Sequence, residues 1–224
     1  RRGWAAVAAR SQGGTPGKLY DLGRYEEAET TFGKEDALPA LVKLLMANGA
    51  ARVLAVPVEE EADYPAAFAL LGEQESVKVV VCDSQTLSVQ QALRDQVLAD
   101  AQVRRERIAV VPGGAEESVS QLVARAKELN SERVVLRDPV GEGGGAAVAA
   151  AVAGAIAGES DPAIPLGGAE LKGVDGLEAR YGDTEIDTRV RGGVTPVEQA
   201  AGVVSVVRGV TTRTKTGEAA DATW

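Results

Sequence analysis

The sequence contains no histidine and only one cysteine, Cys82, among 224 residues. Without histidine, the chain cannot form a Ser-His-Asp or Cys-His nucleophile or a histidine-ligated zinc site. A single cysteine excludes a disulfide within the chain, which fits a reducing compartment. Any catalysis would therefore depend on carboxylates, lysine, tyrosine or a cofactor.

Basic patches and long apolar runs are also missing. The formal net charge is −9, and the densest basic segment, residues 104–107, is interrupted by Glu106. Both features argue against binding to nucleic acid or to an anionic membrane, because such surfaces select clustered Lys and Arg.

The longest apolar run, residues 146–157, is too short and too rich in alanine to span a bilayer. No signal peptide is visible, and because the chain begins at Arg1 and stops at Trp224, we expect it to be part of a longer protein.

Short apolar runs alternate with helical patterns through most of the chain. The runs are continuous rather than alternating, as in strands that are buried on both faces, and they occupy residues 52–58, 77–82, 108–111 and 134–136. Between them, apolar residues recur at helical spacing in residues 63–71, 87–106 and 116–129. This order predicts an α/β fold with a mostly parallel sheet flanked by helices.

Additional C-terminal strands are expected at residues 194–198, 203–208 and 210–214. Residues 204–207 should pair with the large sheet or its edge, because that run is also apolar on both sides. The threonine-rich segment 211–214 carries little apolar weight and predicts an exposed edge.

We expect three regions along the chain. Residues 1–33 should form an N-terminal strand and a short helix that join the core, and residues 34–165 the α/β core itself. Residues 166–224 should form a loop and a strand-rich closing segment.

A glycine loop, Gly141-Glu-Gly-Gly-Gly145, separates the last core strand from an alanine-rich helix. Backbone amides at a helix N-terminus can hold phosphate. However, the loop lacks the Gly-Lys-Ser/Thr of a P-loop and the spacing of a dinucleotide fingerprint, and Glu142 adds a negative charge. We interpret it as a turn, with a phosphate loop as the alternative. Further along the helix, Gly154 and Gly158 are spaced for close contact with another helix, and we interpret this spacing more simply as tight packing on the sheet.

Other candidate residues each have a structural and a chemical interpretation. The acidic residues 59–61 and Asp63 could ligate a hard cation or start a helix. Cys82 could be a reactive thiol or a small buried hydrophobe. Asp83 and Asp138 follow strands, where doubly wound enzymes place chemistry, but they could equally cap helices or start turns. The structural interpretation is the simpler one in each case, so we assign no catalytic, cofactor-binding or metal-binding residue and no cofactor.

The closing part of the chain resembles a known family. Gly192-Gly-Val-Thr-Pro-Val-Glu198, followed by residues 202–212, is similar to the segment of contractile phage tail sheath proteins that leads into their C-terminal domain. Other segments resemble the same family in matching order and spacing, namely residues 22–33, 44–56, 161–166 and 170–173.

The resemblance implies a structural subunit that polymerises around a tail tube and contracts to drive the tube through a target cell envelope. Its implied partners are neighbouring sheath subunits, the tail tube protein and the baseplate, with no nucleic acid and no membrane. Its implied location is the virion tail sheath, assembled in the cytoplasm of the bacterial host. The middle region of the family is sometimes called subtilisin-like, but a protease of that kind needs a histidine. In the family, strand exchange and most tube contacts belong to parts that would precede Arg1 and follow Trp224.

Two interpretations from different classes remain. One is the sheath subunit that the resemblance implies, and the other is a small α/β enzyme that binds a nucleotide or a flavin. Periodicity does not separate them, because both need alternating strands and helices. An adaptor that shares the fold is a third alternative. For a sheath subunit, we expect residues 1–224 alone to be monomeric at micromolar concentration. We also expect residues 211–224 to be mobile or held by neighbouring molecules.

Overall fold

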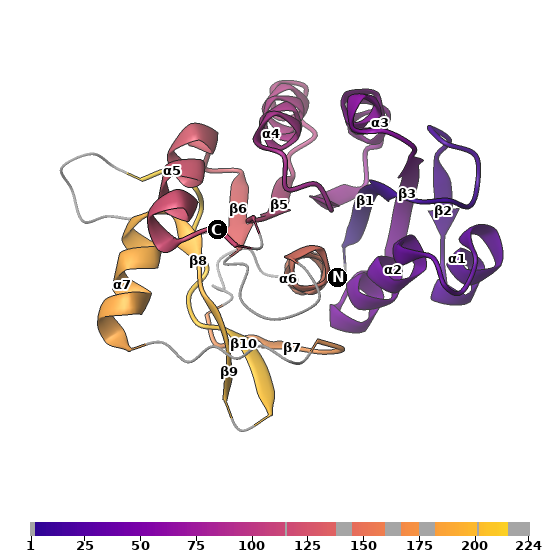
Figure 1. Ribbon diagram of the computed structural model, residues 1–224. Coiled ribbons are helices and arrows are strands. Elements are labelled where there is room, and N and C mark those ends of the chain that lie inside the picture. The colour runs from indigo at the N-terminus through magenta and orange to yellow at the C-terminus, as the bar shows by residue number, and fades with distance from the viewer. Residues whose placement is uncertain are drawn as a thin grey trace.

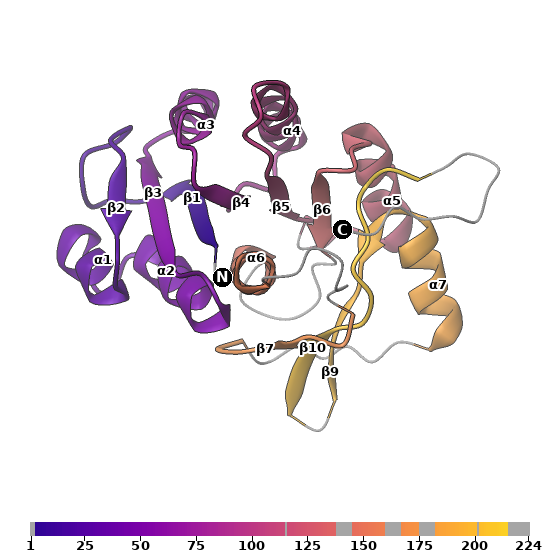
Figure 2. The ribbon, with the colours of Figure 1, turned by 180° about the vertical axis from the view of Figure 1, so that it is seen from behind.

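The computed structural model describes residues 3–114, 116–137, 145–159, 167–174, 182–200 and 202–214. These residues form a large sheet with helices on both faces and a small antiparallel sheet beside one of those helices (Figures 1 and 2).

The large sheet has seven strands in the order β2-β3-β1-β4-β5-β6-β8. Their bounds are β1 (Trp4–Arg10), β2 (Tyr20–Leu22), β3 (Arg52–Val58), β4 (Val77–Cys82), β5 (Ile108–Pro112), β6 (Val134–Arg137) and β8 (Val194–Thr195). The β2–β3 pair is antiparallel, and the other five pairs are parallel. This confirms the predicted α/β fold with a mostly parallel sheet. The four predicted core strands are β3, β4, β5 and β6, and β1 lies between β3 and β4.

Helices cover both faces of this sheet. One face carries α3 (Tyr64–Gly72), α4 (Leu87–Gln102) and α5 (Val119–Leu129), and the other carries α1 (Tyr25–Phe32), α2 (Ala37–Asn48) and α6 (Gly145–Gly158) (Figure 1). A single 3₁₀ turn, η1 (Glu61–Asp63), precedes α3, and α7 (Asp183–Arg191) precedes β8. Because successive side chains of a strand point to opposite faces, each buried strand contributes to two separate cores.

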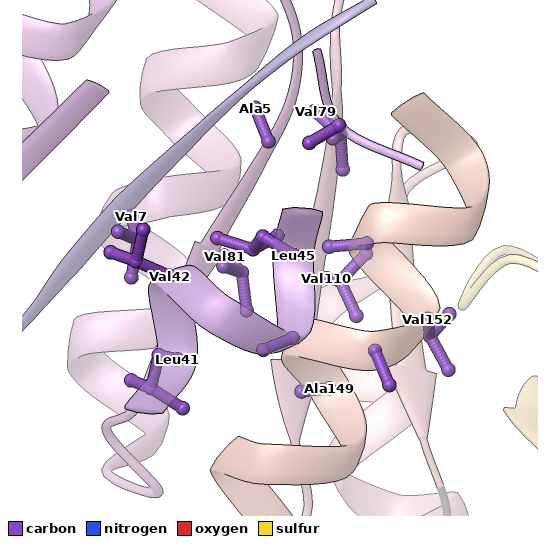
Figure 3. Packing of buried hydrophobic residues seen from close by; sticks show 14 of the residues in the cluster. Ala5, Val7, Leu41, Val42, Leu45, Val79, Val81, Val110, Ala149 and Val152 are labelled. Atoms are coloured by element: carbon purple, nitrogen blue, oxygen red, sulfur yellow. The ribbon is translucent and has the colours of Figure 1, made fainter. Parts of the chain in front are cut away.

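The strand β1 shows this division clearly. Ala5 and Val7 pack with α2 and α6, whereas Ala6 and Ala8 belong to the core on the opposite face, with α3 and α4. Figure 3 shows the first of these cores, in which side chains from both helices approach the sheet: Ala5, Val7, Val79, Val81 and Val110 from the strands, Leu41, Val42 and Leu45 from α2, and Ala149 and Val152 from α6.

Helix α6 is buried on nearly all sides because it lies between the two sheets. The small sheet has the order β7-β10-β9, with β7 (Glu170–Leu171), β9 (Val197–Ala200) and β10 (Val203–Val206). Its residues Leu171, Val204 and Val206 share a hydrophobic cluster with α6, and Figure 2 shows α6 between this sheet and the large one. A helix that is apolar all round is expected in such an enclosed place.

The glycines of α6 serve a helix–helix contact rather than the predicted contact with the sheet. A Cβ atom on Gly154 would lie 2.5 Å from the Leu45 carbonyl oxygen, and one on Gly158 would lie 2.8 Å from the Gly49 Cα. Leu45 lies in the last turn of α2, and Gly49 is the C-cap residue that follows it. The spacing therefore predicted a close approach correctly but named the wrong surface.

Three predictions for the C-terminal strands were wrong, and one of them is the strand expected at residues 210–214, which does not form. Residues 203–206 do not pair with the large sheet, because a turn at Gly202, with φ of 81°, folds β10 back on β9 over α6. The segment after β10 is not an exposed edge either, because Thr211 and Thr212 are each 1% exposed. Residues 215–224, whose mobility we predicted, lie outside the described part of the chain.

Helix boundaries differ from the prediction mainly in α4 and α5. Helix α4 ends at Gln102, four residues early, because Arg104 adopts a left-handed conformation with φ of 65°. Helix α5 begins at Val119, after a capping box in which the hydroxyl of Ser118 accepts a hydrogen bond from the amide of Gln121.

Candidate functional site at the carboxyl edge of the large sheet

The strand order reverses direction at β1. From β1 the chain proceeds to β3 on one side, and β4, β5 and β6 then follow on the other side. In doubly wound proteins, ligands bind outside the carboxyl ends of the strands at such a switch point. The crevice between the ends of β1 and β4 is therefore where a nucleotide or flavin site would lie.

Asp83 lies at this switch point, where its carboxylate forms hydrogen bonds within the chain. One of its carboxylate oxygens accepts a hydrogen bond from the Arg10 amide at 3.1 Å, and the other accepts one from the Tyr64 hydroxyl. Burial raises the pKa of Asp83 and also that of Tyr64. A carboxylate at this place repels a phosphate, and the amide that a phosphate would use already has a partner.

A second carboxylate supports the turn that follows β4. Glu61 accepts a hydrogen bond from the Ser84 hydroxyl at 3.0 Å and lies 3.9 Å from the guanidinium of Arg10. The hydroxyl of Ser84 also accepts a hydrogen bond from the Thr86 amide at 3.2 Å. These contacts fix the start of α4.

The polar network continues across the ends of β4 and β5. The buried amide group of Gln90 donates to the carbonyls of Ser84 and Pro112, at 2.9 and 2.6 Å. Arg125 donates to Gln90 Oε1 at 3.1 Å and forms an ion pair with Glu117 at 2.7 Å. The side chains of Gln90, Arg125 and Glu117 thus bond within the chain rather than facing a ligand. Their network holds α4, α5 and the ends of β4 and β5 together.

Sequence reasoning missed Gln90 and Arg125. Gln90 directly follows Val89, which belongs to the apolar stripe of α4, and it is fully buried. A polar residue in that position needs hydrogen-bond partners in the core. The signal was therefore present, but the sequence does not show which carbonyls the side chain reaches.

An open hollow of about 980 Å³ lies next to the loop after β1. Its lining includes Ser11, Glu35, Asp36 and Glu59. Asp36 occupies the N-cap position of α2, but its side chain does not cap that helix. It accepts hydrogen bonds from the Ser11 hydroxyl at 2.5 Å and the Gln12 amide at 3.2 Å, and thereby holds the loop against α2.

The remaining candidates from the sequence do not form a chemical site in the described structure. The acidic residues 59–61 and Asp63 are exposed, and Asp63 accepts a hydrogen bond from the Glu60 amide at 3.1 Å as the η1 turn begins. Cys82 is fully buried, and burial raises the pKa of its thiol. Among the described residues, no group of three or more Cys, Asp or Glu side chains is placed to hold a metal ion.

Two of the candidates cannot be assessed. Asp138 and residues 141–144 of the glycine loop lie outside the described residues. Gly145, the first residue of α6, is described, and a Cβ atom there would lie 2.7 Å from the Cβ of Pro112. This glycine therefore permits a close approach of α6 to the end of β5.

Within the described ranges, no helix is long and apolar enough to cross a membrane.

The family of the chain follows from a match over more than half of its length. Residues 58–212 match the family model described as the phage tail sheath protein central domain. The chain therefore belongs to the phage tail sheath protein family. No curated protein sequence gives a match.

Solved structures of sheath proteins share the fold. The sheath tail protein of Desulfitobacterium hafniense superposes with a TM-score of 0.78 at 11% identity, covering 96% of this chain and 72% of that one. The sheath tail protein of Listeria innocua gives 0.74 at 11% identity, covering 97% and 70%. The contracted helical sheath of the anti-feeding prophage gives 0.70 at 15% identity, covering 97% of this chain and 64% of that one. The present chain thus spans slightly less than two thirds of the anti-feeding prophage sheath chain.

Proposed function

We propose that this chain is the central part of a structural subunit that polymerises around a tail tube and contracts to drive the tube through a target cell envelope. The family match over residues 58–212 carries the proposal. The hydrogen-bonded ends of β4 and β5 support it, because Asp83 and the Gln90 network form structural contacts with groups that a related enzyme fold would offer to a ligand.

The proposed partners are neighbouring sheath subunits, the tail tube protein and the baseplate. Similarity to chains in two anti-feeding prophage assemblies, the contracted helical sheath and the baseplate, supports this set. The proposed location is the tail sheath of a phage or phage-derived particle that assembles in the bacterial cytoplasm.

Co-sedimentation with the tube protein tests the proposed function. The complete sheath protein and the tube protein of the same particle should pellet together as long tubes, whereas each alone should leave less material in the pellet. Both proteins remaining in the supernatant when mixed would contradict a sheath role.

We further propose that the domain has no catalytic or nucleotide-binding function. Titration of the purified chain with ATP, NAD and FMN should leave the melting temperature unchanged. A ligand at about 100 times its dissociation constant would add about 2.7 kcal/mol to the free energy of unfolding, which a melting curve resolves. A clear upward shift with any of the three would favour the α/β enzyme instead.

A further inference from the structure

The turn between α4 and β5 presents an unpaired cation at the amino edge of the large sheet. Arg104 is exposed, and its side chain has no ion-pair partner among the described residues. Val103 beside it is 56% exposed. The following residues anchor the turn, because Arg105 donates to the Gly72 carbonyl at 2.8 Å and the buried Arg107 donates to the end of α3. We call Val103 and Arg104 the Arg104 corner. It places a charged side chain beside an apolar one on an anchored turn.

The opposite edge of the sheet carries the complementary charge. The hollow next to the loop after β1 is lined by Glu35, Asp36 and Glu59, and we call it the acidic hollow. Glu35 and Glu59 are exposed, and neither has an ion-pair partner in the described part of the chain. Arg10 and Lys34 also line the hollow, but further acids follow directly in residues 60–63, so the surroundings remain negative.

The corner and the hollow cannot meet within one molecule. Glu59 directly follows the carboxyl end of β3, whereas Arg104 precedes the amino end of β5 in the same parallel sheet. A strand of seven residues, such as β3, spans about 23 Å at roughly 3.3 Å per residue. Any contact between the two surfaces must therefore join different copies of the chain.

We propose that the Arg104 corner of one copy docks on the acidic hollow of the next copy. This inference rests on the proposed function, since it names the partner as a second sheath subunit. Two different surfaces meet in such a contact, so it is heterologous and propagates from copy to copy into a ring or a helix. The hollow accommodates the projecting Val103 and Arg104, and the opposite charges favour this orientation over the docking of two like surfaces.

The contact is individually weak and sensitive to salt. Exposed ion pairs contribute little by themselves, and salt screens them. A chain at micromolar concentration therefore stays monomeric, whereas repetition of the contact in an assembled array raises its total strength.

Disulfide trapping tests the contact in the chain as it stands. In the double variant Lys34→Cys/Val103→Cys, one introduced thiol lies in the hollow and the other on the corner, Arg104 and the acids keep their charges, and Cys82 is buried. Oxidation at high protein concentration and low salt should give a ladder of multimers on a non-reducing gel, with disulfides that peptide mapping assigns to position 34 of one copy and position 103 of the next. Either single variant should give at most dimers, because one surface then lacks its thiol. Absence of a ladder in the folded double variant, or disulfides that join only like positions, would overturn the contact.

Charge reversal gives a second measurement that does not depend on cysteine. Arg104→Glu and Glu59→Arg should each lower self-association at high concentration in light scattering by several-fold, and the double reversal should restore it. Arg24→Glu, an exposed arginine with no ion-pair partner among the described residues, is the matched control and should leave association unchanged. Single reversals that associate like the unmodified chain would contradict the contact.

The outcomes separate this inference from the proposed function. Tubes that form with the tube protein but give no ladder would overturn the contact and leave the sheath role standing. A ladder from a protein that never forms tubes would support the contact and contradict the sheath role.

Discussion

Asp83 has a structural role at a position where an enzyme of similar fold would place a catalytic or binding residue. It lies at the switch point of the sheet, yet it accepts hydrogen bonds from the Arg10 amide and the Tyr64 hydroxyl. Burial outweighs these donors and raises the pKa of the carboxyl group. Nearby Glu61 acts in the same direction, because its negative charge disfavours ionisation of Asp83.

This pKa shift predicts a specific dependence of stability on pH. The folded state holds the Asp83 proton more tightly than the unfolded state, so the free energy of unfolding falls as pH rises from the ordinary value of 3.8 through the raised pKa. Asp83→Asn removes this titration. Urea denaturation at several pH values measures the unfolding free energy of both chains. The value for the unmodified chain minus that for the variant should therefore decrease as pH rises over that range. A difference that is constant with pH would show that Asp83 titrates normally.

Gly154 is a residue whose missing side chain sets a helix distance. A Cβ atom there would lie 2.5 Å from the Leu45 carbonyl oxygen and 2.8 Å from the Asn48 Cβ. Gly154→Ala should therefore lower the free energy of unfolding by about 1–3 kcal/mol through overpacking, although alanine is the better helix former. Ala147→Ser, on a half-buried position of the same helix, should change it by less than about 0.5 kcal/mol. Thermal denaturation measures both, and equal effects would show that α2 and α6 separate without cost.

At the scale of elements, the segment from Val210 to Arg213 forms a strap that returns from β10 to the large sheet. The Thr195 hydroxyl donates to the Val210 carbonyl at 3.0 Å and accepts from the Val210 amide at 3.2 Å. The Thr212 hydroxyl makes the same two kinds of bond with Ser131, at 3.1 and 2.9 Å. Threonine side chains thus supply both a donor and an acceptor, as a neighbouring strand would.

Adjacent threonines of the strap allow a matched comparison. Thr212→Val leaves the buried amide and carbonyl of Ser131 without their side-chain partner, so we expect the free energy of unfolding to fall by about 1–3 kcal/mol. The hydroxyl of Thr211 is buried without a hydrogen-bond partner among the described residues. Thr211→Val should therefore be neutral or slightly stabilising. Chemical denaturation of both variants checks this, and equal losses would show that the hydroxyl of Thr212 contributes nothing specific.

The core shows where sequence reasoning succeeds, and the strap shows where it fails. Residues 52–58 and 77–82 form strands as predicted, because continuous apolar runs bounded by turn residues have few other stable arrangements. The burial of Thr212 could not be predicted, because it depends on hydrogen bonds to Ser131, 81 positions away. The pairing of β10 likewise depends on α6, which needs a second apolar surface. Sequence patterns thus predicted the local elements, while long-range partners decided their places.

The candidate site, too, could be predicted from the sequence only in part. The position of Asp83 at a strand end was visible in the sequence, and its chemical role was left open. The donors that bind it, on β1 and at the start of α3, lie 73 and 19 residues away. Spacing alone could not identify them.

For the whole molecule, charge opposes association of bare chains. The formal net charge is −9, and like-charged molecules repel one another. We therefore expect residues 1–224 to remain monomeric at micromolar concentration. Light scattering should report the mass of one chain, about 23.1 kDa. Regular tubes formed by these residues alone would contradict this expectation.

Electron microscopy of the complete sheath protein tests the central claim most directly. The present chain spans 64% of the anti-feeding prophage sheath chain, so the protein should be imaged at its full natural length, alone and with its tube protein. The account predicts rings or tubes whose wall contains this α/β fold as its repeating unit. Discrete monomeric particles under both conditions would contradict a sheath subunit.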